Sequence, residues 1–444
     1  MNIPKLRQQK TVKKCHGVSW EDNYAWVHQK NILDVLKDSS VLNPEVKKYL
    51  EENNNYTEDQ LEDTKKIQKK LFNEIKGRIK LDDESPPFTD KKYIYWTKTT
   101  KETNYAIKLR KKIGTNKIEE YWSGEKEKKK LNTEYFGIGD LEVSDNEEML
   151  AYSLDLKGSE YFTIYVRRIS DNKIISEEIK ETSGSITWSL DDKYIFYSKL
   201  DKYHRPKKIY RHKIGSSPKD DQLIFEEKDE GFTCSIDISS DEKYYIVSTS
   251  DHTSSEVHFF NVKEINIKPK LFKKRQKEIR YSIDSWNGNF FIHTNLDAED
   301  FKICMCKHDS IQNWKDYIPA TKGVLIGGFN LLNEWMIRSE VRDALSKLYV
   351  RNLNIDSEEE LIITEEKVMS SIQKLSGEKT IILIAHRLTT LQECDTIFLL
   401  NEGKLIDQGN FQYLMESNLT FRQMARKESE KNILESQKFH EKSQ

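Results

Sequence analysis

The stretch that decides the fold is Trp188-Ser-Leu-Asp-Asp-Lys-Tyr-Ile-Phe-Tyr-Ser198, in which a polar turn leads into a run of aromatic and β-branched residues. The same pattern occurs from Val143 to Ser153 and from Ile238 to Ser248. Weaker copies of the pattern begin near Pro87, Trp286 and Leu331. Successive copies start roughly 45 to 56 residues apart, a repeat length that is typical of β-propeller blades. The sequence therefore predicts six blade starts.

The region around these copies, from about residue 81 to 365, reads as strands throughout. Short aromatic and β-branched runs alternate in it with clusters of Asp, Asn, Gly and Ser, which is typical of strands and turns, and we expect no helices there. One blade cannot bury both of its faces alone, so successive blades stack radially. We therefore predict a mainly β protein built on a β-propeller.

The first 80 residues predict an extended segment followed by a helical arm. Asn43 before Pro44 is an N-cap followed by proline at the first helical position, and Thr57 with Gln60 fits a capping box. The apolar residues of the helix expected after this box recur every four positions, at Ile67, Leu71, Ile75 and Ile79. Such a stripe predicts an amphipathic helix that packs into a core.

Composition excludes several classes of partner. The chain has 444 residues with 72 Lys+Arg against 74 Asp+Glu, so its net charge of −2 predicts neither a nucleic-acid nor a membrane-surface partner. Its apolar runs are far shorter than the roughly 20 residues of a membrane helix, and its start lacks the apolar core of a signal peptide. We expect no membrane insertion and a cytoplasmic location.

Candidate ligand sites are few. Cys304 and Cys306 share one face of a strand, and we interpret them as small buried side chains and not as half of a metal site. The five cysteines do not form a disulfide framework. Two Lys-rich stretches, Lys126–Lys130 and Lys268–Arg280, read as solvated loops and not as anion-binding patches. No metal site is predicted.

Many short segments carry a family resemblance in the right order. They include His16-Gly17 with Asp22-Asn23-Tyr24-Ala25-Trp26, Tyr49 to Asn53 with Tyr56-Thr57, Gly77 to Lys80 with Asp83 to Ser85, Tyr135 to Ser153, Gly158 to Tyr161, Trp188 to Tyr197, Arg205-Pro206 with Tyr210-Arg211-His212, and Thr253 to Val257. Over about residues 5 to 365 the chain resembles the oligopeptidase B (protease II) branch of the prolyl oligopeptidase family.

That resemblance implies a serine peptidase in which a helical arm and a seven-bladed propeller precede an α/β-hydrolase domain, and which cleaves short peptides after Arg or Lys. The nucleophile of such a domain needs a Gly-x-Ser-x-Gly elbow. Here the only glycines four apart are Gly323 and Gly327, with Leu325 between them. We therefore assign no catalytic residue, and we interpret the histidines as structural or surface residues, including His16, His204, His252 and His293.

The pattern changes again near residue 366. A continuous apolar strand, Lys379–Ala385, leads into His386, and Asp395–Leu400, Glu402–Lys404 and Asp407–Gly409 follow. This order resembles the end of an ABC transporter ATP-binding domain, which implies that His386 occupies the position of the switch histidine that contacts ATP. A nucleotide site also needs Gly-x-x-x-x-Gly-Lys, whereas the one candidate, Gly323 to Gly328, is followed by Phe329. We therefore predict no cofactor, and a non-functional His386.

The sequence thus predicts four parts: a helical arm (1–80), an incomplete seven-bladed-type propeller of about six blades (81–365), a small α/β ABC fragment (366–426) and a charged tail (427–444). Joining the parts of two enzymes suggests a gene fusion or an assembly error. We expect the propeller portion of a serine oligopeptidase that is inactive alone. The alternative is a non-catalytic module that binds peptides or a separate hydrolase domain in trans.

Overall fold

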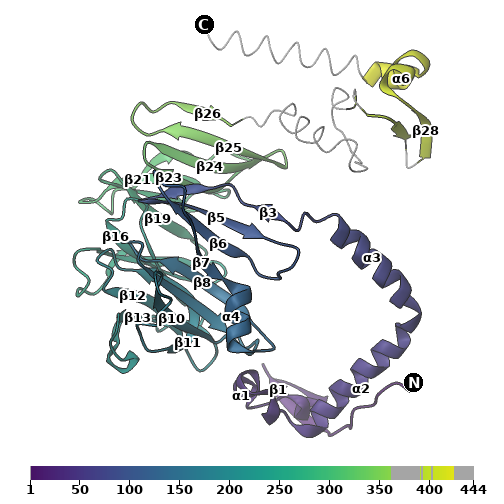
Figure 1. The fold of residues 1–444 in the computed structure, drawn as a ribbon, viewed down its shortest axis with the longest axis horizontal. Helices are drawn as coiled ribbons and strands as arrows, with labels where there is room; N and C mark the ends of the chain where they lie inside the picture. Colours follow the sequence, from purple (N-terminus) through teal and green to yellow (C-terminus); the bar gives the residue numbers. More distant parts are fainter. Residues whose placement is uncertain (1, 362–390, 392–393, 402–403, 425–444) are drawn as a thin grey trace. The chain divides into compact units, whose positions relative to one another are not determined.

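The computed structural model describes residues 2–361, 391, 394–401 and 404–424 (Figure 1). The chain divides into two compact units, Met1–Ser346 and Lys347–Gln444. Among the described residues, no helix is long and apolar enough to cross a membrane.

The N-terminal arm starts with a hairpin and continues as a series of helices. Its elements are β1 (Thr11–Cys15), β2 (Val18–Asp22), η1 (Ala25–Val27), α1 (Ile32–Lys37), η2 (Ser39–Val41), α2 (Pro44–Gln60), η3 (Glu62–Thr64) and α3 (Lys65–Gly77). The Asn43 side chain accepts a hydrogen bond from the Glu45 backbone N–H (2.9 Å), which confirms the predicted N-cap. The capping box is wrong, because Thr57 lies inside α2, and the turn that ends α2 comes only after Gln60.

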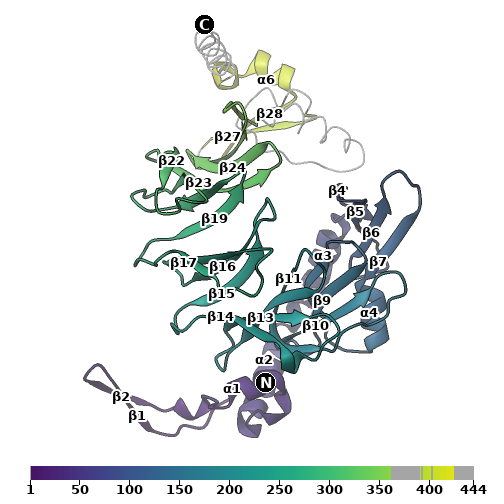
Figure 2. The ribbon, with the colours of Figure 1, turned by 90° about the vertical axis from the view of Figure 1, so that its left-hand side faces the viewer.

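Antiparallel sheets follow in chain order (Figure 2). The first contains β3 (Asp83–Glu84), β4 (Phe88–Asp90), β5 (Tyr93–Thr99), β6 (Ile107–Lys112) and β7 (Ile118–Ser123). The second contains β8 (Gly137–Val143), β9 (Met149–Asp155), β10 (Phe162–Arg168), β11 (Ile179–Trp188), β12 (Tyr194–Leu200), β13 (Pro206–Lys213) and β14 (Gln222–Glu226), with η4 (Pro218–Asp220) before β14. This sheet spans two sequence repeats, because β10 pairs with β11.

The next two repeats form separate four-stranded sheets. One contains β15 (Thr233–Ile238), β16 (Tyr244–Ser250), β17 (Ser255–Asn261) and β18 (Lys270–Lys273). The other contains β19 (Tyr281–Trp286), β20 (Asn289–Thr294), β21 (Lys302–Lys307) and β22 (Lys315–Ile318). A last hairpin of the first unit pairs β23 (Val324–Leu332) with β24 (Trp335–Arg342). The copies from Val143 onward therefore each mark the turn between the first two strands of a repeat, and the copy near Pro87 marks the turn between β4 and β5.

The three clearest copies share one turn geometry. Ser144, Ser189 and Ser239 each accept, through Oγ, a hydrogen bond from the backbone N–H five residues later, at 2.9 to 3.0 Å. Three residues after each serine the backbone adopts a positive φ of 53° to 64°, at Glu147, Asp192 and Glu242. The recurring Ser and Asp of the sequence are thus the residues that reverse the chain.

The apolar residues of these strands are buried between neighbouring sheets. Phe290 is fully buried and packs on the rings of Tyr244, Phe259 and Phe272. Cys304 and Cys306 belong to the same cluster, with exposures of 3 % and 4 %, which confirms that they are small buried side chains on one strand face. This packing explains why the strands alternate as the sequence predicts.

Two predictions about charged stretches are wrong. Residues Gly124–Leu131 form helix α4, where we expected a loop and no helix. The reason lies far along the chain, since α4 places Glu127 against Arg167, and the two buried side chains form an ion pair at 2.5 Å. The second stretch contains strand β18, which pairs with β17.

The second unit contains two described pieces. Strand β25 (Leu345–Asn352), which begins two residues before the unit boundary, pairs with β26 (Glu358–Glu360). A hairpin of β27 (Ile397–Asn401) and β28 (Lys404–Gly409) precedes α6 (Phe411–Ser417), and their small core contains Ile397, Leu399, Leu414 and Phe421. The predicted strand Lys379–Ala385 and His386 lie outside the described residues.

Candidate functional site

An acidic cavity of about 550 Å³ lies where the first strands of three consecutive repeats meet, namely β8, β11 and β15. The turns after β4, β8, β11 and β15 also contribute to its wall. The residues that line it with polar side chains are Asp90, Lys91, Asp140, Glu142, Ser144, Asp145, Ser185, Thr187, Ser235, Asp237 and Glu242.

Strand alternation places these polar groups toward the cavity. Asp140 and Glu142 are two positions apart on β8, while Leu141 between them packs against a hydrophobic cluster. The same spacing recurs on β11 and β15, where the buried Ile186 and Ile236 separate the polar pairs Ser185 with Thr187 and Ser235 with Asp237. The first strand of each of the three repeats thus presents polar side chains to the same cavity.

Hydrogen bonds fix the aspartates of this wall. The Asp140 carboxylate accepts from the backbone N–H of Ile186 at 3.0 Å, so it joins β8 to β11. Asp237 accepts from the N–H of Ile238 at 2.7 Å. Across β11 and β15, the Thr187 hydroxyl donates to the carbonyl of Ile236 at 3.1 Å.

The cavity strongly perturbs the pKa of Glu142. Solvent reaches its side chain from the cavity, yet the surrounding strands enclose it closely. This partial desolvation first, and then the negative charges of Asp140 and Asp237, raise the pKa of Glu142 from 4.5 to about 8. Glu142 is therefore a proton-carrying group near neutral pH.

The charge of the cavity is strongly unbalanced. Asp90, Asp140, Glu142, Asp145, Asp237 and Glu242 line it, against the single cation Lys91, whose ammonium pairs with Asp145. Among the described residues, no His, Cys, Asp and Glu side chains cluster in a way that would hold a metal ion. The arrangement suits a ligand with several positive charges, such as a basic peptide.

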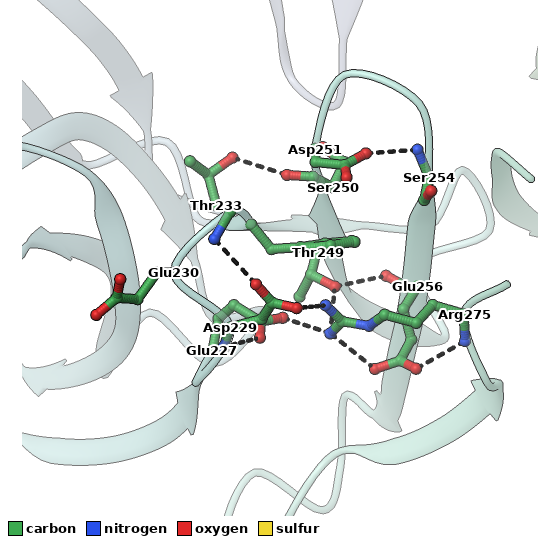
Figure 3. A network of polar contacts seen from close by, with 12 residues as sticks. Glu227, Asp229, Glu230, Thr233, Thr249, Ser250, Asp251, Ser254, Glu256 and Arg275 are labelled. Carbon is green, nitrogen blue, oxygen red and sulfur yellow. Dashed lines mark hydrogen bonds and ion pairs between the residues drawn. The ribbon is translucent and has the colours of Figure 1, made fainter. Parts of the chain in front are cut away.

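A second polar cluster joins two neighbouring repeats (Figure 3). Arg275, just after β18, donates to Glu227 at 2.6 Å and to Glu256 at 3.1 Å, and its guanidinium lies 3.9 Å from the ring centroid of Phe232. Burial raises the pKa of Glu256, but its hydrogen bonds with Arg275 outweigh burial and hold the pKa below the usual range. One guanidinium engages both carboxylates, so loss of Arg275 would leave two nearly buried acids without their partner.

The structure also contains a chain of hydrogen-bonded side chains, centred on the buried His212, that the sequence did not reveal. His212 lies 2.7 Å from Ser176 through Nε2 and 2.7 Å from Asp221 through Nδ1, and Tyr197 donates to the same Asp221. This is the hydrogen-bond order of a hydrolase triad. Acyl transfer also needs an oxyanion hole and a substrate cleft, and Ser176 is not part of the acidic cavity wall. We interpret these hydrogen bonds as structural contacts that hold neighbouring segments of the sheet together, and not as a catalytic triad.

The histidines weighed from the sequence lie apart from one another. His204 contacts the carbonyl of Ser159 at 3.1 Å, and His293 contacts that of Ile326 at 2.8 Å. His16 occupies the turn of the first hairpin, and His252 follows Asp251 in the loop after β16. Gly327 and Leu325 lie within strand β23, so they do not form a strand-to-helix elbow.

Comparison with known proteins identifies the fold. The N-terminal beta-propeller domain of prolyl oligopeptidase matches residues 4–402. Dipeptidyl aminopeptidase BI of Pseudoxanthomonas mexicana is 27% identical over 378 residues, covering 81% of this chain and 50% of that protein. Protease 2 of Moraxella lacunata is 27% identical over 313 residues, covering 69% and 44%. The chain spans about half the length of these curated relatives.

A solved structure of oligopeptidase B from Leishmania major has the same fold, with a TM-score of 0.74 at 19% identity, covering 82% of this chain and 54% of that one. The heterocyst differentiation ATP-binding protein HepA of Nostoc matches only 54 residues, at 41% identity, covering 12% of this chain and 9% of that protein. The propeller match to residue 402 overlaps the predicted ABC fragment. On this evidence the chain belongs to the prolyl oligopeptidase family through its N-terminal β-propeller domain.

Proposed function

We propose that this chain is the propeller portion of a serine oligopeptidase of the oligopeptidase B type, that it binds basic peptides in its acidic cavity, and that it hydrolyses no peptide on its own. The observation that carries the proposal is a cavity wall with six acidic residues against one lysine, which is itself paired with Asp145. Family membership and the peptidase names of the relatives support it.

The physical basis is charge complementarity in a confined space. Carboxylates that line a concave wall raise the local concentration of cations, and the effect weakens as salt screens it. Asp140 and Asp237 are held by backbone hydrogen bonds, so they need little reorganisation when a ligand arrives. Lys or Arg side chains of a peptide replace the counterions and donate hydrogen bonds to the wall.

The test compares peptides and variants of matched charge. A fluorescent Arg-rich peptide is titrated against wild-type protein, with a Glu-rich peptide as control. The triple variant Asp140→Asn, Glu142→Gln, Asp237→Asn should weaken binding at least about tenfold, since each lost charge pair contributes of the order of 1 kcal/mol. The matched control, Glu134→Gln, Glu230→Gln, Glu299→Gln, removes three exposed acids outside the cavity and should bind as wild type.

Two further readouts complete this test. Binding should strengthen from pH 6 to pH 9, because Glu142 with its raised pKa of about 8 becomes an anion in that interval. Arg-p-nitroanilide reporters should show no turnover with the pure protein. Equal binding of both peptides, or binding by the cavity variant equal to that of its control, would refute the peptide site, and turnover would refute the inactive propeller.

A separate hydrolase domain acting in trans is the second candidate partner. The peptidase names of the relatives support it. Affinity purification of the tagged chain, followed by labelling with a serine-directed fluorophosphonate, tests this. A labelled polypeptide in equimolar amount supports the assembly, and its absence contradicts it.

We also propose that residues 366–426 derive from an ABC ATP-binding domain and bind no ATP. The short match to HepA and the compact β27–β28 hairpin with α6 support the origin. A rise in melting temperature with millimolar Mg-ATP would contradict the absence of binding, because a ligand that binds the native state stabilises it.

A further inference from the structure

The acids of the cavity wall differ in what supports their negative charge. The Asp140 carboxylate accepts hydrogen bonds from two backbone N–H groups, those of Leu141 and Ile186, both at 3.0 Å. Asp237 accepts one, at 2.7 Å from the backbone N–H of the next residue. No described residue donates a hydrogen bond to the Glu142 carboxyl group or forms an ion pair with it. Backbone donors favour the ionised form of a carboxyl group, and Glu142 has no such support.

Glu142 also lies close to other acids. Asp140 and Glu142 are two positions apart on β8, so both side chains project into the cavity, and Asp237 of β15 lines the same wall. Acids that share one site repel each other when all are ionised, so the site retains a proton, and the group without a hydrogen-bond donor carries it. The pKa of Glu142, raised to about 8 by desolvation first and then by Asp140 and Asp237, agrees with this assignment.

The remaining charged groups around Glu142 do not replace that proton. The other ionisable residues on the surrounding elements are Asp90 of β4, Lys91 of the turn before β5, Tyr121 of β7, Asp145 after β8 and Glu242 after β15, and β11 contributes none to the wall. Lys91 is the one cation among the residues that line the cavity, and it pairs with Asp145. A positive charge beside Glu142 therefore has to come from a ligand.

We propose that a cationic group of the ligand takes the place of the Glu142 proton, so that binding in the cavity releases one proton. The O–H bond of the Glu142 carboxyl group breaks, the proton passes to a buffer base in the surrounding water, and a guanidinium or ammonium N–H donates to the new carboxylate. This inference rests on the proposed peptide site and states how pH regulates it. Acid solution occupies the position with a proton, and alkaline solution frees it for the ligand.

The experiment is calorimetric titration of the full chain with the Arg-rich peptide at pH 7, in phosphate and in Tris buffer of equal ionic strength. The two buffers differ in the heat that they exchange on taking up a proton. The difference between the two binding enthalpies therefore gives the number of protons released per peptide. We expect about 0.5 to 1 proton, because a group with a pKa of about 8 is mostly protonated at pH 7.

Two variants locate the proton. Glu142→Gln keeps the shape of the protonated acid but has no proton to release. Compared with wild type, it should bind equally at pH 6 and about fivefold more weakly at pH 8.5, and its binding should release no proton. The matched control, Glu242→Gln, removes another acid from the same wall and leaves Asp140 and Glu142 in place, so proton release should persist.

The outcomes separate this inference from the proposed function. Absence of peptide binding at every pH between 6 and 9 would overturn the peptide site, and this inference with it. Binding with equal enthalpies in the two buffers would leave the peptide site standing and overturn the proton exchange alone. Equal proton release by wild type and Glu142→Gln would also overturn it, because the proton would then come from another acid of the wall.

Discussion

The cluster around Phe290 and the helix α3 are both rich in large apolar residues, yet they differ in what covers them. Phe290 is fully buried against Tyr244, Phe259 and Phe272, which come from the preceding repeat. Phe72 on α3 is 63 % exposed, and no residue of that helix is buried. The comparison teaches that an apolar stripe in a sequence specifies a need for burial without saying what supplies it.

The sharpest way to break this comparison is to shorten one phenylalanine in each region. Phe290→Ala leaves a cavity in a packed core and should lower the free energy of unfolding by about 3 to 5 kcal/mol. Phe72→Ala removes an exposed ring and should change it by less than about 0.5 kcal/mol. Urea titrations followed by tryptophan fluorescence measure both. Similar losses at the two sites would mean that the arm is packed in solution.

Buried and exposed ion pairs extend the comparison with a smaller effect. Arg275→Met strands the carboxylates of Glu227 and Glu256, both nearly buried, and should cost about 2 to 4 kcal/mol, somewhat less than full burial of the pair implies because Arg275 is partly exposed. Arg78→Met breaks the exposed pair with Glu74 and should cost less than about 0.5 kcal/mol. Urea titrations again apply, and equal costs would contradict a stabilising role for the Arg275 cluster.

The smallest expected effect concerns Glu142 and pH. Its pKa is about 8 in the folded chain against an ordinary 4.5, so the folded state holds a proton that the unfolded state releases between these values. Stability should therefore decrease as pH rises from 4.5 through 8, with the full loss present above 8. Glu142→Gln should remove this decrease, so its melting temperature should exceed that of wild type more at pH 8.5 than at pH 5. If the difference in melting temperature between the variant and wild type did not depend on pH, the raised pKa of Glu142 would be contradicted.

The local parts of the fold were accessible from the sequence. The repeated Ser and Asp turn is visible because Ser144, Ser189 and Ser239 make the same short-range hydrogen bonds three times. The Asn43 cap likewise acts only two residues away, on Glu45. Interactions between residues so close in the sequence can be recognised as short sequence patterns.

The long-range parts were not accessible. Helix α4 is fixed by Glu127 and Arg167, 40 residues apart, and Ser176 meets His212 across 36 residues. The cavity depends on three strands that converge from separate repeats, so Glu142 looks no different in the sequence from Glu148, which does not line the cavity. Only the arrangement of sheets shows which carboxylates share one space.

The pairing of β10 with β11 has a mechanical consequence. Main-chain hydrogen bonds between β10 and β11 join the second and third repeats into one continuous sheet. Between β11 and β15, by contrast, the Thr187 side-chain hydroxyl donates a hydrogen bond to the backbone carbonyl of Ile236. Two walls of the acidic cavity, β8 and β11, therefore belong to one continuous sheet, and the wall that carries Asp237 belongs to the next sheet. The seam between β11 and β15, beside Asp237, is therefore the part of the cavity wall that no main-chain strand pairing holds together.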